Sequence, residues 1–184
     1  AIQGASYLQD IGDWYNKNVT GSMIIQGRML RDIRLGSKNN PVIISISSLT
    51  LSNCVSLQRL LLSNITTLSG TLNLTACEHL QEIYADGTSL AQIVLPSGGG
   101  LRVVEYSRFN QYLSLSNYPL LTDDGIGIDL CKTVISDFFI VDCALVRPMK
   151  ILVDIMNAQM EQGDNHALKR IRAVGFEESY NNSF

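Results

Sequence analysis

The sequence predicts a repeat solenoid of the α/β class, an elongated stack of coils dominated by short parallel β-strands. Three observations support this fold class. A pattern of apolar-x-apolar-x-x-Cys ends at every cysteine, namely Cys54, Cys77, Cys131 and Cys143. The first two of these cysteines are 23 residues apart. The composition is rich in aliphatic and small polar residues, with 24 Leu, 18 Ile, 18 Ser and 13 Asn in 184 residues. We therefore expect the cysteines to mark the register of the repeat.

A shorter step of about 11 residues lies inside this period. The pattern apolar-x-x-apolar-x-apolar begins at Leu30, Leu57, Leu80, Leu90, Leu101 and Leu168. Because side chains alternate along a strand, the last two apolar residues of each pattern share one face of a short strand, and the first turns inward at the preceding corner. Coils stacked at about 4.8 Å would join these residues into one aliphatic core.

The elements before residue 148 are a cap and a run of coils. Residues 1–22 are polar and mixed, and we expect an N-terminal cap over the first open edge, with Trp14 buried in it or, alternatively, used for binding. Residues 23–147 form the repeat coils. Three glycines at 98–100 favour a tight corner. A phosphate loop is the alternative, but no Gly-Lys-Ser/Thr follows.

Residues 148–184 are expected to form a helix, a terminal repeat strand and a polar tail. Pro148 suits a first helical turn, and Gly163 ends the helix. The strand 168–174 adds one more coil. One helical stripe is interpreted as core packing, with a binding face as the alternative; it comprises Met149, Leu152, Val153, Met156 and Met160. The whole chain is expected to be one continuous domain excised from a larger protein.

Two segments resemble the leucine-rich repeat: Leu49-x-Leu51-x-x-Cys54-x-x-Leu57 and Leu72-x-Leu74-x-x-Cys77-x-x-Leu80. The 23-residue period and the segment 87–96 resemble the bacterial surface-protein type of this superfamily. The resemblance covers roughly 23–146 and 168–176, and it implies a leucine-rich-repeat solenoid. After residue 98 the spacing becomes irregular. Phe109 and Tyr118 stand where the repeat pattern expects Cys or Asn.

A narrower resemblance rests on four short runs at 7–13, 70–77, 83–88 and 95–99. These runs are similar to segments of large repeat-bearing virion proteins in phages of gut Bacteroides. The resemblance implies a structural or tail-associated part of a virus particle, in a protein much longer than this chain.

Charge and hydropathy exclude two classes of function. With 14 basic and 17 acidic side chains, the net charge of −3 leaves no excess of Lys or Arg to release phosphate counterions, so we expect no nucleic-acid partner. No run approaches the roughly 20 apolar residues of a membrane span.

The sequence nominates no catalytic, cofactor-binding or metal-binding residue. His79 and His166 lie outside any metal-ligand spacing. The cysteines are expected to be buried free thiols; the alternative is disulfides between Cys54 and Cys77 or between Cys131 and Cys143. The acidic run 123–129 is interpreted as a solvated turn, with a weak calcium site as the alternative.

Outward-facing strand residues are the remaining candidates. We predict a partner-binding patch on one face, formed by Leu61, Tyr84, Val94 and Glu105. Scattered exposed residues without a partner are the alternative. The predicted function is therefore a non-catalytic structural and interaction module of a phage virion or tail-associated protein. Its surface would contact protein, glycan or other segments of the same longer chain. A bacterial cell-surface adhesin is the alternative, so the expected location is the virion or the cell surface.

Overall fold

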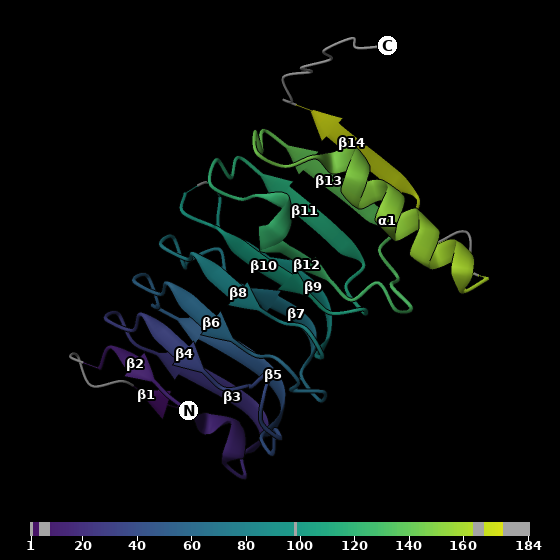
Figure 1. Ribbon diagram of the computed structural model, residues 1–184. Coiled ribbons are helices and arrows are strands. Elements are labelled where there is room, and N and C mark those ends of the chain that lie inside the picture. Colours follow the sequence, from purple (N-terminus) through teal and green to yellow (C-terminus); the bar gives the residue numbers. More distant parts are fainter. Residues whose placement is uncertain (1, 4–7, 98, 164–167, 175–184) are drawn as a thin grey trace, which may run out of the picture.

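The protein is a parallel β-solenoid of about five turns (Figure 1). A computed structural model describes residues 2–3, 8–97, 99–163 and 168–174. All strand pairs within these residues are parallel. The predicted repeat solenoid of short parallel strands is thereby confirmed.

Six short strands form the first sheet, one from each successive coil. In chain order they are β2 (Asp10–Ile11), β4 (Asp32–Arg34), β6 (Arg59–Leu61), β8 (Glu82–Tyr84), β10 (Val103–Tyr106) and β12 (Ile126–Ile128). Their apolar positions align into one inward ladder of Ile11, Ile33, Leu60, Ile83, Val104 and Ile126. Because these side chains must all reach the core, a slip of one residue would expose the ladder, and the register is strongly specified.

The opposite side of the solenoid carries the remaining strands in three sheets, ordered β1-β3-β5, β7-β9 and β11-β13-β14. Their bounds are β1 (Ile2–Gln3), β3 (Thr20–Gln26), β5 (Ser45–Ser52), β7 (Ser69–Asn73), β9 (Ser89–Val94), β11 (Tyr112–Ser116), β13 (Asp137–Val141) and β14 (Arg170–Val174). Aliphatic side chains from both sides meet in one continuous core between the sheets. We refer to the side that carries these three sheets as the second side.

The step of about 11 residues reflects an alternation between the two sides. The patterns that begin at Leu30, Leu57, Leu80 and Leu101 lead into strands of the first sheet. The patterns at Leu90 and Leu168 lead into β9 and β14 on the second side. The same local pattern thus occurs on both sides. β14 differs from the other strands because it is exposed along its whole length, including Ile171.

Residues 2–3 and 8–22 extend the two sides of the stack. β1 pairs with β3, and β2 pairs with β4. A short 3₁₀ turn, η1 (Trp14–Asn16), lies between β2 and β3 in the chain. Trp14 is partly buried against the core. The boundary expected at residue 22 falls within β3, because the chain has already entered a strand of the second side by Thr20.

The C-terminal helix, α1 (Pro148–Glu161), begins at the expected proline. It packs on the core through Ile151, Leu152 and Ile155, whereas Met149 and Met160 are each 64% exposed. Val153 and Met156 are exposed as well, so the interpretation of the predicted stripe as core packing is wrong except for Leu152, which is buried. The helix is apolar on two sides, and only the side with Ile151, Leu152 and Ile155 packs against the core. No helix within the described residues has the length and apolarity needed to cross a membrane.

Three of the four cysteines are buried, and Cys131 is exposed. Cys54, Cys77 and Cys143 follow strands of the second side, whereas Cys131 follows β12 of the first sheet. The expectation that all four cysteines mark one repeat position and are buried is therefore wrong for Cys131, because its pattern lies on the other side of the coil. All four are free thiols. The expected tail at 177–184 and His166 lie outside the described residues.

Candidate functional site: a groove between β9 and β11

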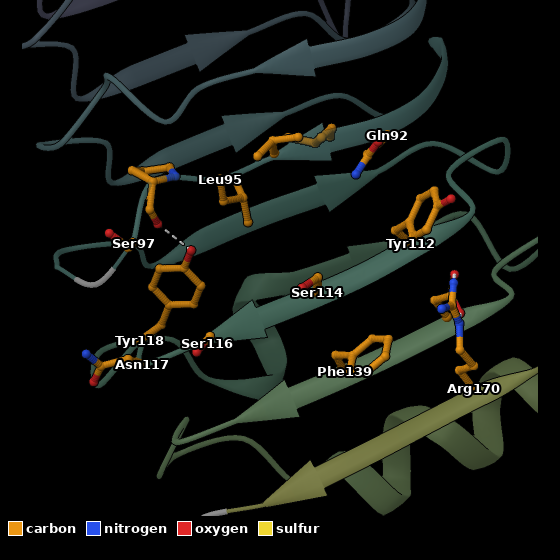
Figure 2. A pocket seen from close by; sticks show the side chains of 14 residues that line it. Gln92, Leu95, Ser97, Tyr112, Ser114, Ser116, Asn117, Tyr118, Phe139 and Arg170 are labelled. Carbon is orange, nitrogen blue, oxygen red and sulfur yellow. Dashed lines mark hydrogen bonds and ion pairs between the residues drawn. The ribbon is translucent and has the colours of Figure 1, made fainter.

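A groove of about 570 Å³ opens on the second side, where β9 and β11 follow one another in the stack without pairing (Figure 2). β9 is the last strand of the sheet β7-β9, and β11 is the first strand of the sheet β11-β13-β14. The first sheet is continuous at the same level, since β8, β10 and β12 pair in full. The break is thus local to the second side.

Hydrogen bonds join β9 and β11 at both ends of the gap between them, and the groove lining continues onto β13 and β14. Where the two strands begin, the Gln111 amide donates to the Ala91 carbonyl at 2.9 Å. Where they end, the Tyr118 hydroxyl donates to the Pro96 carbonyl at 2.6 Å, and Figure 2 shows this side chain reaching across the gap. The strands therefore separate between two anchored points, which gives the groove a defined length.

Tyr118 takes the corner position that Cys54 and Cys143 occupy in other coils. In each of these coils one residue with a left-handed backbone precedes the corner; these residues are Asn53, Asn117 and Asp142. The Cys54 thiol donates to the Ile25 carbonyl of the preceding coil at 3.7 Å. Tyr118 makes the same kind of contact to Pro96 with a much longer side chain. We infer that this ring, only 3% exposed, holds the two coils apart.

The Tyr118 phenol is a neutral donor over the ordinary pH range. Burial, with a smaller contribution from Cys143, raises the pKa of Tyr118 to about 12. The hydroxyl therefore keeps its proton and its bond to the Pro96 carbonyl near neutral pH.

Aromatic rings and short polar side chains line the groove. The lining residues on the strands include Gln92, Val94, Tyr112, Ser114, Ser116 and Phe139. They alternate along β11 and β13 with core residues such as Leu113 and Phe138. Tyr112 and Phe139 are half-buried, and they lie diagonally on adjacent strands, a separation that aromatic side chains span.

A charged pair stands beside the two rings. Arg170 contacts Asp137 through two bonds, from Nε to Oδ1 and from Nη2 to Oδ2, the latter at 2.9 Å. The Asp137 side chain is only 4% exposed. The hydrogen bonds from Arg170, assisted by its charge, lower the pKa of the Asp137 carboxyl. The pair is ionised and electrically balanced at neutral pH.

The structure brings together three of the four residues predicted to form a partner-binding patch. Leu61, Tyr84 and Glu105 occupy one outward row on β6, β8 and β10. Val94 lies on β9 instead, where it lines the groove. The expectation of one shared face is therefore wrong for Val94, because β9 belongs to the second side.

The row that contains Tyr84 is an internally paired ionic network. The Lys38 ammonium lies 4.6 Å from the centre of the Tyr84 ring and contacts Glu105 at 2.5 Å. The Tyr84 hydroxyl donates to Glu82 at 3.0 Å, and the Arg59 guanidinium lies 5.6 Å from the ring centre. Tyr84 is half-buried by these neighbours rather than freely exposed.

The turn expected in the acidic run 123–129 is present over its first three residues, although the Asp123 side chain is only 9% exposed. These residues form the 3₁₀ turn η2 (Asp123–Gly125), which leads into β12. Asp123 accepts hydrogen bonds from the Arg147 backbone amide at 2.6 Å and from its guanidinium at 2.5 Å. Within the described residues, no group of three or more His, Cys, Asp or Glu is placed to hold a metal ion.

Sequence analysis did not identify Tyr112, Phe139 or Arg170 as site residues. They belong to three neighbouring strands of one sheet, β11, β13 and β14, and share no motif. Only the stacking of the coils brings them together. The one local signal was Tyr118 at a position where the repeat expects Cys or Asn.

Comparison with known proteins identifies no relative: no family model, curated protein or solved structure matches this chain. The fold and the geometry of the groove are therefore the basis for a functional proposal.

Proposed function

We propose that the chain is a non-catalytic structural and interaction module whose rigid solenoid contacts a protein or glycan partner through the groove between β9 and β11. The groove itself is the observation that carries this proposal. It lies at one of the two breaks in strand pairing on the second side, the other being between β5 and β7. Hydrogen bonds join β9 and β11 at both ends of the gap, and aromatic and polar side chains line it. Its volume of about 570 Å³ lies within the range of about 300–1,000 Å³ typical of ligand sites.

Rigidity supports a role in presenting a surface. The strands of the first sheet pair without interruption from β2 to β12, and the aliphatic core runs from Ile11 on β2 to Ile155 on α1. A ligand in the groove would meet strands held by this core, so little conformational entropy would be lost on binding.

The proposal includes a more specific affiliation. We assign the coils to the leucine-rich-repeat superfamily, in its 23-residue bacterial surface-protein type, with residues 1–22 as an N-terminal cap. We place the chain in a larger phage virion or tail-associated protein, with the virion surface as its location. The repeat patterns at 49–57 and 72–80 support the superfamily, and the four short runs given above support the phage source.

A bacterial cell-surface adhesin is the second candidate, because the same repeat patterns occur in that type of protein. The neighbouring genes distinguish the two. Capsid, portal or tail genes beside this one would support the virion, and a bacterial operon without them would support the adhesin.

A binding screen tests the groove. Fluorescently labelled wild-type chain, Phe139→Leu and Tyr84→Leu are applied to one panel of glycans and purified surface proteins. Phe139→Leu removes a ring in the groove, and Tyr84→Leu is the matched change on the first sheet. We expect binding by the wild type and by Tyr84→Leu, and loss of binding by Phe139→Leu.

Two results would contradict the proposal. Loss of binding only in Tyr84→Leu would place the contact on the row Leu61, Tyr84 and Glu105. Absence of binding by all three proteins would leave the solenoid a spacer.

A further inference from the structure

The polar side chains of the groove have free hydrogen-bonding capacity. Gln92, Ser114, Ser116 and Asn117 line it, and their side chains form no hydrogen bond to other described residues. Hydroxyl and amide groups both donate and accept hydrogen bonds. They therefore match a ligand whose own groups do both, which is the chemistry of sugar hydroxyls.

Two rings supply the apolar contact that such a ligand needs. Tyr112 and Phe139 lie diagonally on β11 and β13 and are both half-buried in the groove wall. A pyranose ring has one apolar C–H face, and an aromatic face packs against it while the sugar hydroxyls point to the surrounding polar groups. In Figure 2 both rings lie along the same side of the groove as Ser114.

The charge in the groove favours a neutral ligand. Among the described residues that line it, one is an acid and one is a base, Asp137 and Arg170, and the two neutralise each other through a two-point contact. An anionic ligand would have to compete with a carboxylate that is already in place. The guanidinium is held in a fixed plane and still has donors to offer.

The hydrogen bonds at the two ends of the gap disfavour an extended peptide inserted as a strand between β9 and β11. A strand added between β9 and β11 would run along both and pass their ends. One end is blocked by the bond between Gln111 and Ala91, and the other by Tyr118 against Pro96. The groove is open toward solvent between these points, so a compact ring enters from the outer side.

From these four observations we propose that the groove is a binding site for a neutral oligosaccharide. The inference rests on the proposed function and specifies its ligand. Tyr112 and Phe139 pack against sugar rings, while Gln92, Ser114 and the Arg170 guanidinium bond to hydroxyls.

Calorimetric titration of the full 184-residue chain tests the ligand class. The probes are neutral hexose and N-acetylhexosamine oligosaccharides, their uronic-acid counterparts, and a set of extended peptides. We expect a neutral oligosaccharide to bind with an affinity that changes little between about 0.05 and 0.5 M salt. Phe139→Leu, which keeps the apolar volume that supports folding, should weaken this binding by about tenfold or more.

Matched variants keep the result interpretable. Phe139→Tyr retains the ring and should bind within about twofold of wild type, and Tyr84→Leu on the first sheet should leave the affinity unchanged. Thermal unfolding of each variant verifies that it is folded.

The remaining outcomes overturn the inference in distinguishable ways. A preference for the uronic-acid probes that fades with salt would show an anionic ligand. Peptide binding that Phe139→Leu abolishes would replace the saccharide with a peptide and leave the proposed function standing. No binding by any probe, together with a negative surface-protein screen, would refute both.

Discussion

Replacing Tyr118 with Phe tests whether this residue anchors the groove. The substitution removes the hydroxyl that donates to the Pro96 carbonyl at 2.6 Å and keeps the ring. Pro96 is buried, so its carbonyl loses a partner that water does not readily replace. An unsatisfied buried acceptor costs about 1–3 kcal/mol, and we expect the free energy of unfolding to fall by about 2 kcal/mol.

The assay is urea unfolding at equilibrium, read as a lower midpoint with an unchanged slope. Tyr112→Phe is the matched control, because the Tyr112 hydroxyl makes no hydrogen bond within the described part of the chain and its removal should change stability little. A loss below about 0.3 kcal/mol in Tyr118→Phe would refute the anchoring role.

The stability difference between wild type and Tyr118→Phe should depend on pH. Burial raises the pKa of Tyr118 from 10.0 to about 12, so the folded state holds the phenolic proton more tightly than the unfolded chain does. The stabilising effect is therefore complete below pH 10 and is lost as the pH rises from 10 toward about 12. The stability difference between wild type and Tyr118→Phe should shrink over that interval, and a constant difference would contradict the assignment.

Three further predictions concern the core, the ion pair and the thiols. Ile83→Ala truncates a fully buried member of the inward ladder and should lower the free energy of unfolding by roughly 3 kcal/mol in urea titrations. Arg170→Ala removes the partner that lowers the pKa of Asp137; its destabilising effect should be largest near neutral pH and shrink below pH 3.8, as urea midpoints at successive pH values would show. Native protein should react with a thiol reagent rapidly at Cys131 alone, whereas Cys77, whose pKa burial raises to about 12, should react only after denaturation.

Much of the solenoid followed from local pattern. Leu60, Ile83 and Val104 each stand at the centre of an apolar-x-x-apolar-x-apolar segment, and each lies in the inward ladder. A strand side chain points to one of two faces, so a repeated apolar spacing is enough to predict which residues are buried.

The same pattern could not assign a strand to one side of the coil. Val94 and Tyr84 follow similar spacings, yet they lie on different sides. Cys131 ends the same motif as Cys54 and is exposed. Two-residue alternation carries no information about which of two facing sheets a strand joins, because both sheets bury one face against the same core.

The candidate site was even harder to predict from the sequence. The motif that ends at Cys54 and Cys143 has Tyr118 in its place in one coil, which marks an irregularity without saying that a groove results. Phe139 and Arg170 come from later coils and have no sequence feature that relates them to β9.

The spacing of apolar residues within each coil dictates their burial, so local pattern is enough to predict parallel coils stacked around an aliphatic core. Where the second side opens depends instead on contacts between coils. The distance between two coils depends on the side chains packed between them, and β9 and β11, which the Tyr118 side chain bridges, do not pair. The groove is therefore a property of neighbouring coils together, and the tertiary structure is needed to see it.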